Sequence, residues 1–232
     1  VDLICLQKDR TEPERETIGG INVFRVPLKR SRGSKLRYLA QYSSFILCSF
    51  ACLARRSLSQ RYDMIHVHNM SDALVFSALI PKMLGAKVIL DLHDPMPELM
   101  QVIFGLQESS FGVQLLKLLE KWSIGFADLA VTVNLACKRI YTSRSCRPDK
   151  IIVVMNAPDD RIFQFEPPHL NGANGSGLAQ PFSILYHGSL VPRNGLDLAV
   201  DALAIANERV PGARLIICGE RSSFLEEVMA SA

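Results

Sequence analysis

The chain has 232 residues, of which 48% are hydrophobic, and its formal net charge is +3. This composition supplies enough apolar side chains for a sizeable core and excludes a globally disordered protein. The charge is too small to indicate nucleic acid binding. The Cys residues form no C-x-x-C pair and so indicate reduced, packed thiols of a cytosolic protein; they stand at 5, 48, 52, 137, 146 and 218.

Strands and helices are expected to alternate along the first two thirds of the chain. The predicted strands cover 1–6, 21–27, 63–68, 86–92, 128–133 and 150–155, and the predicted helices cover 37–59, 71–84, 110–126 and 134–144. Ser71 is a favoured N-cap, and Gly85 suits the end of the same helix. Short Val-, Ile- and Leu-rich strands separated by helices predict a parallel sheet with both faces covered. We therefore expect an α/β domain over residues 1–165.

One uncharged stretch, 38–54, has two interpretations. It follows a basic segment that contains Lys29, Arg30, Arg32, Lys35 and Arg37. A transmembrane helix needs about 20 mainly apolar residues, whereas this stretch is shorter and includes Gln41 and several Ser. A packed domain helix is favoured. A basic loop beside an apolar helix could still rest on anionic lipid.

The last third of the chain begins with a change of composition. Residues 166–181 are rich in Pro, Gly and Asn and predict a flexible linker. The alternation of strands and helices then resumes. Strands are expected over 182–186 and 213–218, and helices over 195–209 and 221–230. An apolar stripe supports the first of these helices. We expect residues 182–232 to begin a second α/β domain.

Polar side chains follow two successive strands of the predicted sheet. His68 and Asn69 end the strand at 63–68, and His93 and Asp94 end the strand at 86–92. Ligands bind at the carboxyl ends of strands in open parallel sheets, so these four residues are site candidates. His66 lies within its strand, and either a core role or a site role remains open for it.

The loop from Gly188 to Gly195 joins a strand to a helix in the second domain. Backbone N–H groups in such loops and at helix amino ends favour anions. Arg193 adds a planar cation suited to phosphate. The loop matches neither a Walker A motif nor G-x-G-x-x-G, so an ordinary connecting loop with a surface Arg is the alternative.

Several segments resemble a known family. They read YDMIHVHNMSDALVFSALIPKMLGAKVILDLHDPMPELM, then EKWSIGFADLAVTVN and KIIVVMNAPDDRIF, and then ILYHGSLVPRNGLDLAVDALA. In this order and spacing they resemble glycosyltransferase family 4, the retaining GT-B enzymes. The resemblance implies an N-terminal, acceptor-side Rossmann-like domain with a parallel sheet, followed by the first part of a Rossmann-like donor-binding domain.

The resemblance also implies a role for each site residue. His93 corresponds to the family's cleft histidine near the donor sugar, and Asp94 would orient His93 or bind the acceptor. His68 and Asn69 would lie on the acceptor side. The donor diphosphate would contact the loop residues Gly188, Ser189, Arg193, Asn194 and Gly195. Ser189 and Asn194 depart from the family's commonest loop, which has Arg and Lys at these positions, so Arg193 would supply the charge.

The implied reaction transfers a sugar from a nucleotide-sugar donor to a saccharide or lipid-linked acceptor with retention, in polysaccharide, glycan or glycolipid synthesis. No metal and no cofactor are expected, although Asp91-Leu92-His93-Asp94 could be taken for a metal motif. The implied location is cytoplasmic, with possible peripheral contact at the inner face of the membrane. Two alternatives stay open: a non-catalytic GT-B-like partner subunit and a nucleotide-sugar epimerase of the same architecture.

The resemblance implies further sequence at both ends. Family members usually have a strand and a Gly-rich loop before the position of Val1. Their donor domain extends past the position of Ala232 and carries two Glu residues that hold the nucleotide sugar. We therefore expect the 232-residue chain to be a fragment that is inactive by itself.

Overall fold

The computed structural model describes residues 1–9, 11–28, 35–69, 71–164 and 182–231. The chain divides into two compact units, Val1–Asp159 and Asp160–Ala232, which are described separately. The predicted linker 166–181 lies outside the described residues, as do Lys29, Arg30 and Arg32 of the basic segment. The predicted domain bounds therefore stay predictions.

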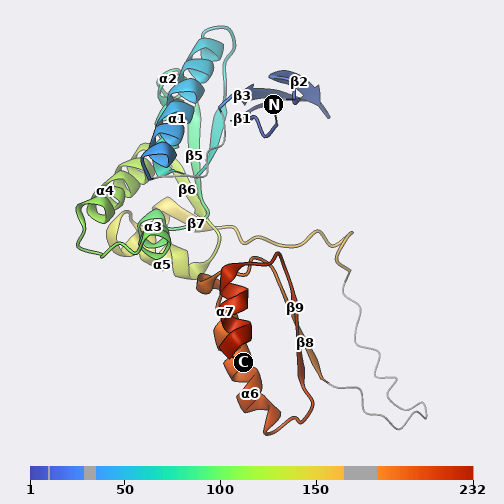
Figure 1. Ribbon diagram of the computed structural model, residues 1–232. Helices are drawn as coiled ribbons and strands as arrows, with labels where there is room; N and C mark the ends of the chain where they lie inside the picture. The colour runs from blue at the N-terminus through green and yellow to red at the C-terminus, as the bar shows by residue number, and fades with distance from the viewer. Residues whose placement is uncertain (10, 29–34, 70, 165–181, 232) are drawn as a thin grey trace. The chain divides into compact units, whose positions relative to one another are not determined.

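A four-stranded parallel sheet forms the centre of the first unit (Figure 1). Its strands are β4 (Met64–His68), β5 (Lys87–Leu92), β6 (Leu129–Thr132) and β7 (Ile151–Val153), in that order. All three strand pairs are parallel. The four strands predicted in this part of the chain are confirmed with small shifts at their ends.

Helices cover one face of this sheet. They are α1 (Lys35–Ser57), the 3-10 helix η1 (Asp72–Ala78), α2 (Leu79–Met83), α4 (Phe111–Phe126) and α5 (Leu135–Arg144), with the short η2 (Pro148–Lys150) before β7. Leu53, Val75, Ile124 and Tyr141 from four of these helices share one core with the buried side chains of β5. Alternation along β5 buries Val88, Leu90 and Leu92 on this face.

The opposite face of the sheet differs from our expectation that helices cover both faces. In the described part of the first unit, Met64, His66 and His68 of β4 are exposed on this face. Ile89 and Asp91 of β5 beside them are half-buried. The helices meet in the single core on the other face, so the polar side chains of β4 and β5 face outward.

A second, three-stranded sheet contains β1 (Asp2–Leu6), β3 (Ile21–Val26) and β2 (Arg15–Ile18), in the order β1-β3-β2. We predicted β1 and β3 but missed β2, which pairs antiparallel with β3. Gly19 and Gly20 form the two-residue turn between them, with φ of 57° and 82°. Two positive φ values are required by a type I′ turn, and the Gly-Gly pair was the signal for this hairpin.

Helix α1 contains the uncharged stretch whose nature the sequence left open. Leu53 belongs to the core of the first unit, and the buried Ser57 hydroxyl donates to the Leu53 carbonyl at 2.7 Å. Arg56 pairs with Asp2 of β1 at 2.6 Å and holds the three-stranded sheet against α1. The favoured interpretation of a packed helix is thus confirmed. No described helix combines the length and apolarity needed to cross a membrane.

Two further details differ from the predicted elements. The helix expected at 71–84 is η1 followed by α2, and the Ser71 side chain makes no capping hydrogen bond. Helix α3 (Met96–Phe104) was not predicted. Its signals were Pro97 in the first turn and Gly105 at the C-cap, both typical of helix ends.

The second unit is a strand-helix-strand-helix arrangement. It contains β8 (Ser183–His187), the 3-10 helix η3 (Pro192–Asn194), α6 (Leu196–Asn207), β9 (Arg214–Cys218) and α7 (Ser223–Ser231). The two strands pair parallel. Leu190, Leu196 and Val228 form its small core. All four predicted elements are confirmed.

Candidate functional site

The carboxyl ends of β4 and β5 meet at one edge of the sheet, as the sequence predicted. The Asn69 backbone N–H donates to the Asp91 carbonyl at 2.9 Å, which continues the strand pairing past His68. The buried Thr132 hydroxyl at the end of β6 donates to the Leu92 carbonyl at 3.0 Å. These bonds fix the backbone on which His68 and His93 stand.

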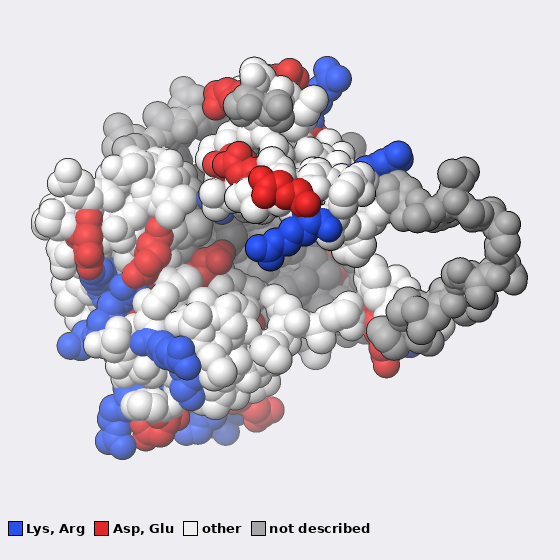
Figure 2. Space-filling model, turned by 90° about the horizontal axis from the view of Figure 1, so that it is seen from below, with Lys and Arg blue, Asp and Glu red and all other residues white. Residues whose placement is uncertain are grey.

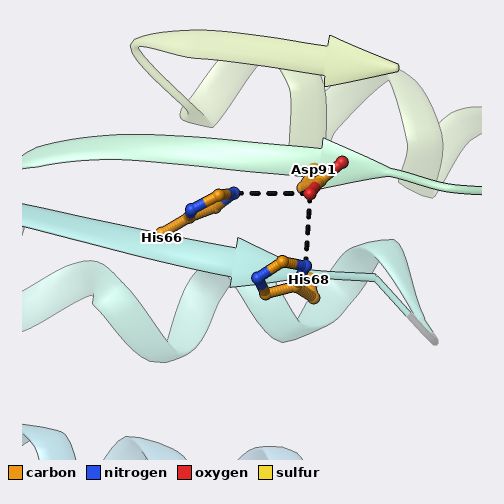
Figure 3. A group of neighbouring side chains, drawn as sticks. All are labelled: His66, His68 and Asp91. Atoms are coloured by element: carbon orange, nitrogen blue, oxygen red, sulfur yellow. Dashed lines mark ion pairs between the residues drawn. The ribbon is translucent and has the colours of Figure 1, made fainter. Parts of the chain in front are cut away.

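Three imidazoles and one carboxylate gather at this edge. Asp91 Oδ2 lies 3.5 Å from His66 Nε2, 3.2 Å from His68 Nδ1 and 3.6 Å from His93 Nε2. Figure 3 shows His66 and His68 on β4 with both rings directed at Asp91 on β5. His68 Nδ1 and His93 Nε2 are 3.4 Å apart. The site residues His68 and His93 are thus brought together.

Crowding lowers the basicity of one member of this cluster, His68. Partial burial lowers the pKa of His68, and the neighbouring His66, whose ring stacks on it at a centroid distance of 4.5 Å, lowers it further. The Asp91 carboxylate opposes this shift. A lowered pKa favours the neutral imidazole near pH 7, which can accept a proton or bind a cation.

Asn69 is the buried link between the two strand ends. Its Oδ1 accepts from the His93 backbone N–H at 2.9 Å, and its Nδ2 donates to Asp72 Oδ1 at 2.8 Å and to the Asp94 carbonyl at 3.4 Å. The side chain is only 6% exposed. Its amide is therefore engaged within the protein, which differs from the expectation of an acceptor-side contact and suits a positioning residue.

Asp91 is a site residue that the sequence analysis named only within a possible metal motif and did not include among the site candidates. We expected Asp94 to orient His93 or to bind the acceptor. Asp94 is exposed, and the carboxylate beside the His93 ring belongs to Asp91. The register pairs His68 with Asp91, and paired residues share one face of a sheet. The signal was that Asp91, in an apolar strand, points away from Leu90 and Leu92.

The loop 188–195 of the second unit, called the donor loop after its expected role, is folded on itself. The Asn194 side chain donates to the Ser189 carbonyl at 2.7 Å, and the Tyr186 hydroxyl donates to the same carbonyl at 3.2 Å. The Asn194 side chain, at a position where the resemblance implies Lys, thus closes the loop from within.

The loop's backbone offers fewer free donors than we expected. The N–H groups of Gly188, Val191, Asn194 and Gly195 each donate to a backbone carbonyl. Arg193 is exposed and has no hydrogen-bond or ion-pair partner among the described residues. Arg193 and the amino end of α6 are therefore the groups of this segment that best suit a phosphate.

Gly219 after β9 is a second residue that the sequence analysis missed. A Cβ at this position would overlap the Gly188 carbonyl oxygen and would lie 2.9 Å from the Leu190 side chain. Only glycine lets the donor loop pack this closely over the end of β9. A Gly directly after a predicted strand was the sequence signal for this close approach.

One surface hollow of the described residues lies away from this site. It measures about 450 Å³ and is found near the amino ends of β6 and β7; its lining includes Gly125, Asp128, Cys146, Arg147 and Lys150. Ligands of open parallel sheets bind at the opposite edge, so this hollow is no candidate site.

Charged side chains show no single-sign surface in the view of Figure 2. Acidic and basic residues lie in small groups separated by larger areas of other residues. The described part of this face thus lacks the continuous basic patch typical of nucleic acid binding. The expectation of no nucleic acid partner stays a prediction.

Solved structures similar to this chain show its fold. Sucrose-phosphate synthase from Thermosynechococcus elongatus is 17% identical, with a TM-score of 0.61 over 96% of this chain and 53% of that one. The catalytic domain of starch synthase IV from Arabidopsis thaliana is 15% identical, with a TM-score of 0.58 over 94% and 56%. HepE from Anabaena is 16% identical, with a TM-score of 0.52 over 90% and 51%.

These similarities show a GT-B type fold, as predicted, in which a Rossmann-like domain is followed by the first part of a second one. The chain spans about half the length of these structures. Residues 1–157 match the glycosyl transferase 4-like domain, and the chain therefore belongs to this glycosyltransferase family. A comparison with curated protein sequences found no match.

Proposed function

We propose that the whole protein transfers a glycosyl group from a nucleotide-sugar donor to a saccharide or lipid-linked acceptor, with retention of anomeric configuration. The observation that carries this proposal is the meeting of His68 and His93 at the carboxyl edge of the sheet in a chain of this family. Starch synthase IV was solved with ADP and acarbose, and HepE with UDP and glucose. These ligands support a donor linked to a nucleoside diphosphate.

In this proposal, the groups at the sheet edge bind the sugar and the acceptor. His93 lies against the donor sugar, with its ring held beside Asp91 and its backbone held by Asn69. His68 lines the acceptor side, where its exposed ring is accessible. Asp94 is exposed and contacts the acceptor through its carboxylate.

The donor loop would bind the diphosphate through Arg193, with Gly188, Ser189, Asn194 and Gly195 shaping the backbone around it. The donor phosphate would accept the proton of the acceptor hydroxyl on the same face of the sugar. The protein then has to position the reactants and stabilise the leaving diphosphate, and it supplies no nucleophile. Neither a metal ion nor a cofactor is required by this reaction.

We place the reaction in polysaccharide, glycan or glycolipid synthesis on the cytoplasmic side, with peripheral membrane contact where the acceptor is lipid-linked. Assays of the whole protein with a panel of nucleotide sugars and acceptors test the activity. Nuclear magnetic resonance of the product's anomeric proton tests retention. A product of inverted configuration would contradict retention but not glycosyl transfer.

The role of His93 is tested by His93→Ala in the whole protein. We expect kcat/KM to fall by about tenfold or more, which corresponds to about 1.4 kcal/mol of transition-state stabilisation. His66→Ala is the matched control. It removes another imidazole that contacts Asp91, but His66 lies within β4 and not at the strand end. An equal fall in both variants would assign the effect to the cluster as a whole.

The role of Arg193 is tested by calorimetric titration of nucleoside diphosphates. A charge-assisted hydrogen bond contributes about 1.5–3 kcal/mol, so Arg193→Ala should weaken binding about ten- to a hundredfold. Arg193→Lys should recover only part of this affinity because a point charge cannot reproduce the planar fork. Arg209→Ala, which alters an exposed Arg after α6, should change nothing. Equal affinities in all proteins would remove Arg193 from the donor site.

A further inference from the structure

The outward face of β4 and β5 carries donor atoms suited to a metal ion. His66 Nε2, His68 Nδ1 and one carboxylate oxygen of Asp91 all lie within 4.8 Å of one another. Imidazole nitrogen with a single carboxylate oxygen is a donor set that Zn²⁺ accepts. We propose that His66, His68 and Asp91 bind one Zn²⁺ ion at this face.

The distances between these atoms agree with tetrahedral coordination. Bonds of about 2.0–2.2 Å to zinc place neighbouring donor atoms of a tetrahedron about 3.3–3.5 Å apart. The observed separations from Asp91 Oδ2 are 3.2 Å to His68 Nδ1 and 3.5 Å to His66 Nε2. Two of the three separations between the donor atoms thus have the length that the ion requires, and the third, between His66 and His68, is within 4.8 Å.

A third imidazole stands beside these three groups. His93 Nε2 lies 3.4 Å from His68 Nδ1 and 3.6 Å from Asp91 Oδ2. The group whose donor atoms all lie within 4.8 Å of one another does not include His93. The proposed ligand set is therefore two imidazoles and one carboxylate, which leaves the fourth position of a tetrahedral ion to water.

The sheet supplies the rigidity and the access that the site needs. His66 and His68 are two residues apart on β4 and so project from the same face, while the strand register places Asp91 opposite His68. The side chains of His66 and His68 are 44% and 62% exposed. This exposure gives an ion access to the two imidazoles from solvent.

The site is tested by calorimetric titration of Zn²⁺ into the 232-residue chain, prepared without a histidine tag, stripped with a chelator and kept reduced. We expect one ion per chain. His66→Gln and Asp91→Asn should each weaken binding by about a hundredfold or more, because even outer-shell partners of metal ligands contribute ten- to a hundredfold. His187→Gln and Asp63→Asn alter exposed residues of the same types and should leave the affinity unchanged.

A second measurement uses Co²⁺ as the probe. Tetrahedral Co²⁺ gives intense visible absorption, which should appear with the original chain and be lost in His66→Gln. Far-UV circular dichroism shows that each variant is folded. Absence of Zn²⁺ binding would overturn the proposal. Binding that persists in both ligand variants would also overturn it and would point to the exposed Cys48 or Cys218. The proposal concerns binding and does not depend on sugar transfer.

Discussion

At the scale of single residues, the buried amide of Asn69 holds the candidate site together. It joins the backbone of His93 and Asp94 after β5 to Asp72 at the start of η1. Two of these bonds tie the end of β4 to the segment after β5, and the third ties it to η1. The geometry of the strand ends therefore depends on a side chain that is itself screened from solvent.

Asn69→Ala should lower the free energy of unfolding by about 1–3 kcal/mol, because it leaves buried polar groups without partners. Urea unfolding followed by far-UV circular dichroism measures this loss. Asn156→Ala is the control, since Asn156 is exposed beyond β7, and its effect should stay within about 0.5 kcal/mol. Equal effects of the two changes would contradict the positioning role of Asn69.

Asp72 makes the stability of the first unit depend on pH. Burial raises the pKa of this carboxyl from 3.8 to about 6, and the hydrogen bond from Asn69 opposes the rise only in part. In the unfolded chain, Asp72 loses its proton at lower pH than in the folded chain. Its contribution to stability is therefore greatest below about pH 4 and is lost as the pH rises through 6.

Asp72→Asn keeps the shape and stays uncharged, so the variant should gain stability relative to the original chain as the pH rises from 4 to 7. The gain should be on the order of 2–3 kcal/mol. Unfolding by urea at a series of pH values measures it. Asp160→Asn, which alters an exposed carboxylate, provides the comparison. A difference that does not vary with pH would show that Asp72 titrates normally.

At the scale of secondary-structure elements, one cation joins three helices. Arg144 at the end of α5 pairs with Glu98 of α3 at 2.5 Å and with Glu120 of α4 at 2.6 Å. The Glu120 side chain is fully buried and also accepts a hydrogen bond from the Ser145 hydroxyl. Removal of Arg144 would leave a buried carboxylate without its counter-charge.

Arg144→Met should cost about 3–5 kcal/mol of stability, the usual result of breaking one side of a buried ion pair. Arg147→Met, three positions on, is the matched control. Arg147 pairs with Asp149 on the surface, where the side chains are 86% and 69% exposed, and such pairs contribute about 0–1 kcal/mol. Thermal and urea unfolding compare the two. The Arg144→Met/Glu120→Gln double variant should recover part of the loss, and no recovery would contradict this explanation.

At the scale of the whole molecule, the two units have unequal cores. Among the described residues, twelve buried side chains form the core of the first unit, whereas three form that of the second. Stability rises with the apolar area removed from water. The second unit should therefore unfold more easily than the first.

We predict that the chain unfolds in two steps. Its single Trp, Trp122 in α4, reports on the first unit alone, whereas far-UV circular dichroism reports on both. The circular dichroism signal should begin to change at a lower urea concentration than Trp fluorescence. Coincident transitions would show that the two units unfold together.

Local patterns of the sequence determined which segments form strands and helices around the site. Apolar runs ending at His68 and Leu92 predicted the parallel strands, and their shared direction predicted that His68 and His93 meet at one edge. These features depend on hydrophobic periodicity and on the chirality of strand-helix-strand connections. Both can be recognised in short segments of sequence. The hairpin at Gly19 and Gly20 also depends on a local signal. We missed it because we did not interpret the Gly-Gly pair as a type I′ turn.

Only the tertiary structure decided how the polar groups divide their roles. Asp91, rather than Asp94, lies beside the His93 ring because the register of β4 and β5 pairs it with His68. Asn69 is buried because η1 brings Asp72 against it, and Gly219 is required because the donor loop lies over β9. Register, burial and close approach are set by residues far apart in the chain, so no single segment of sequence contains them.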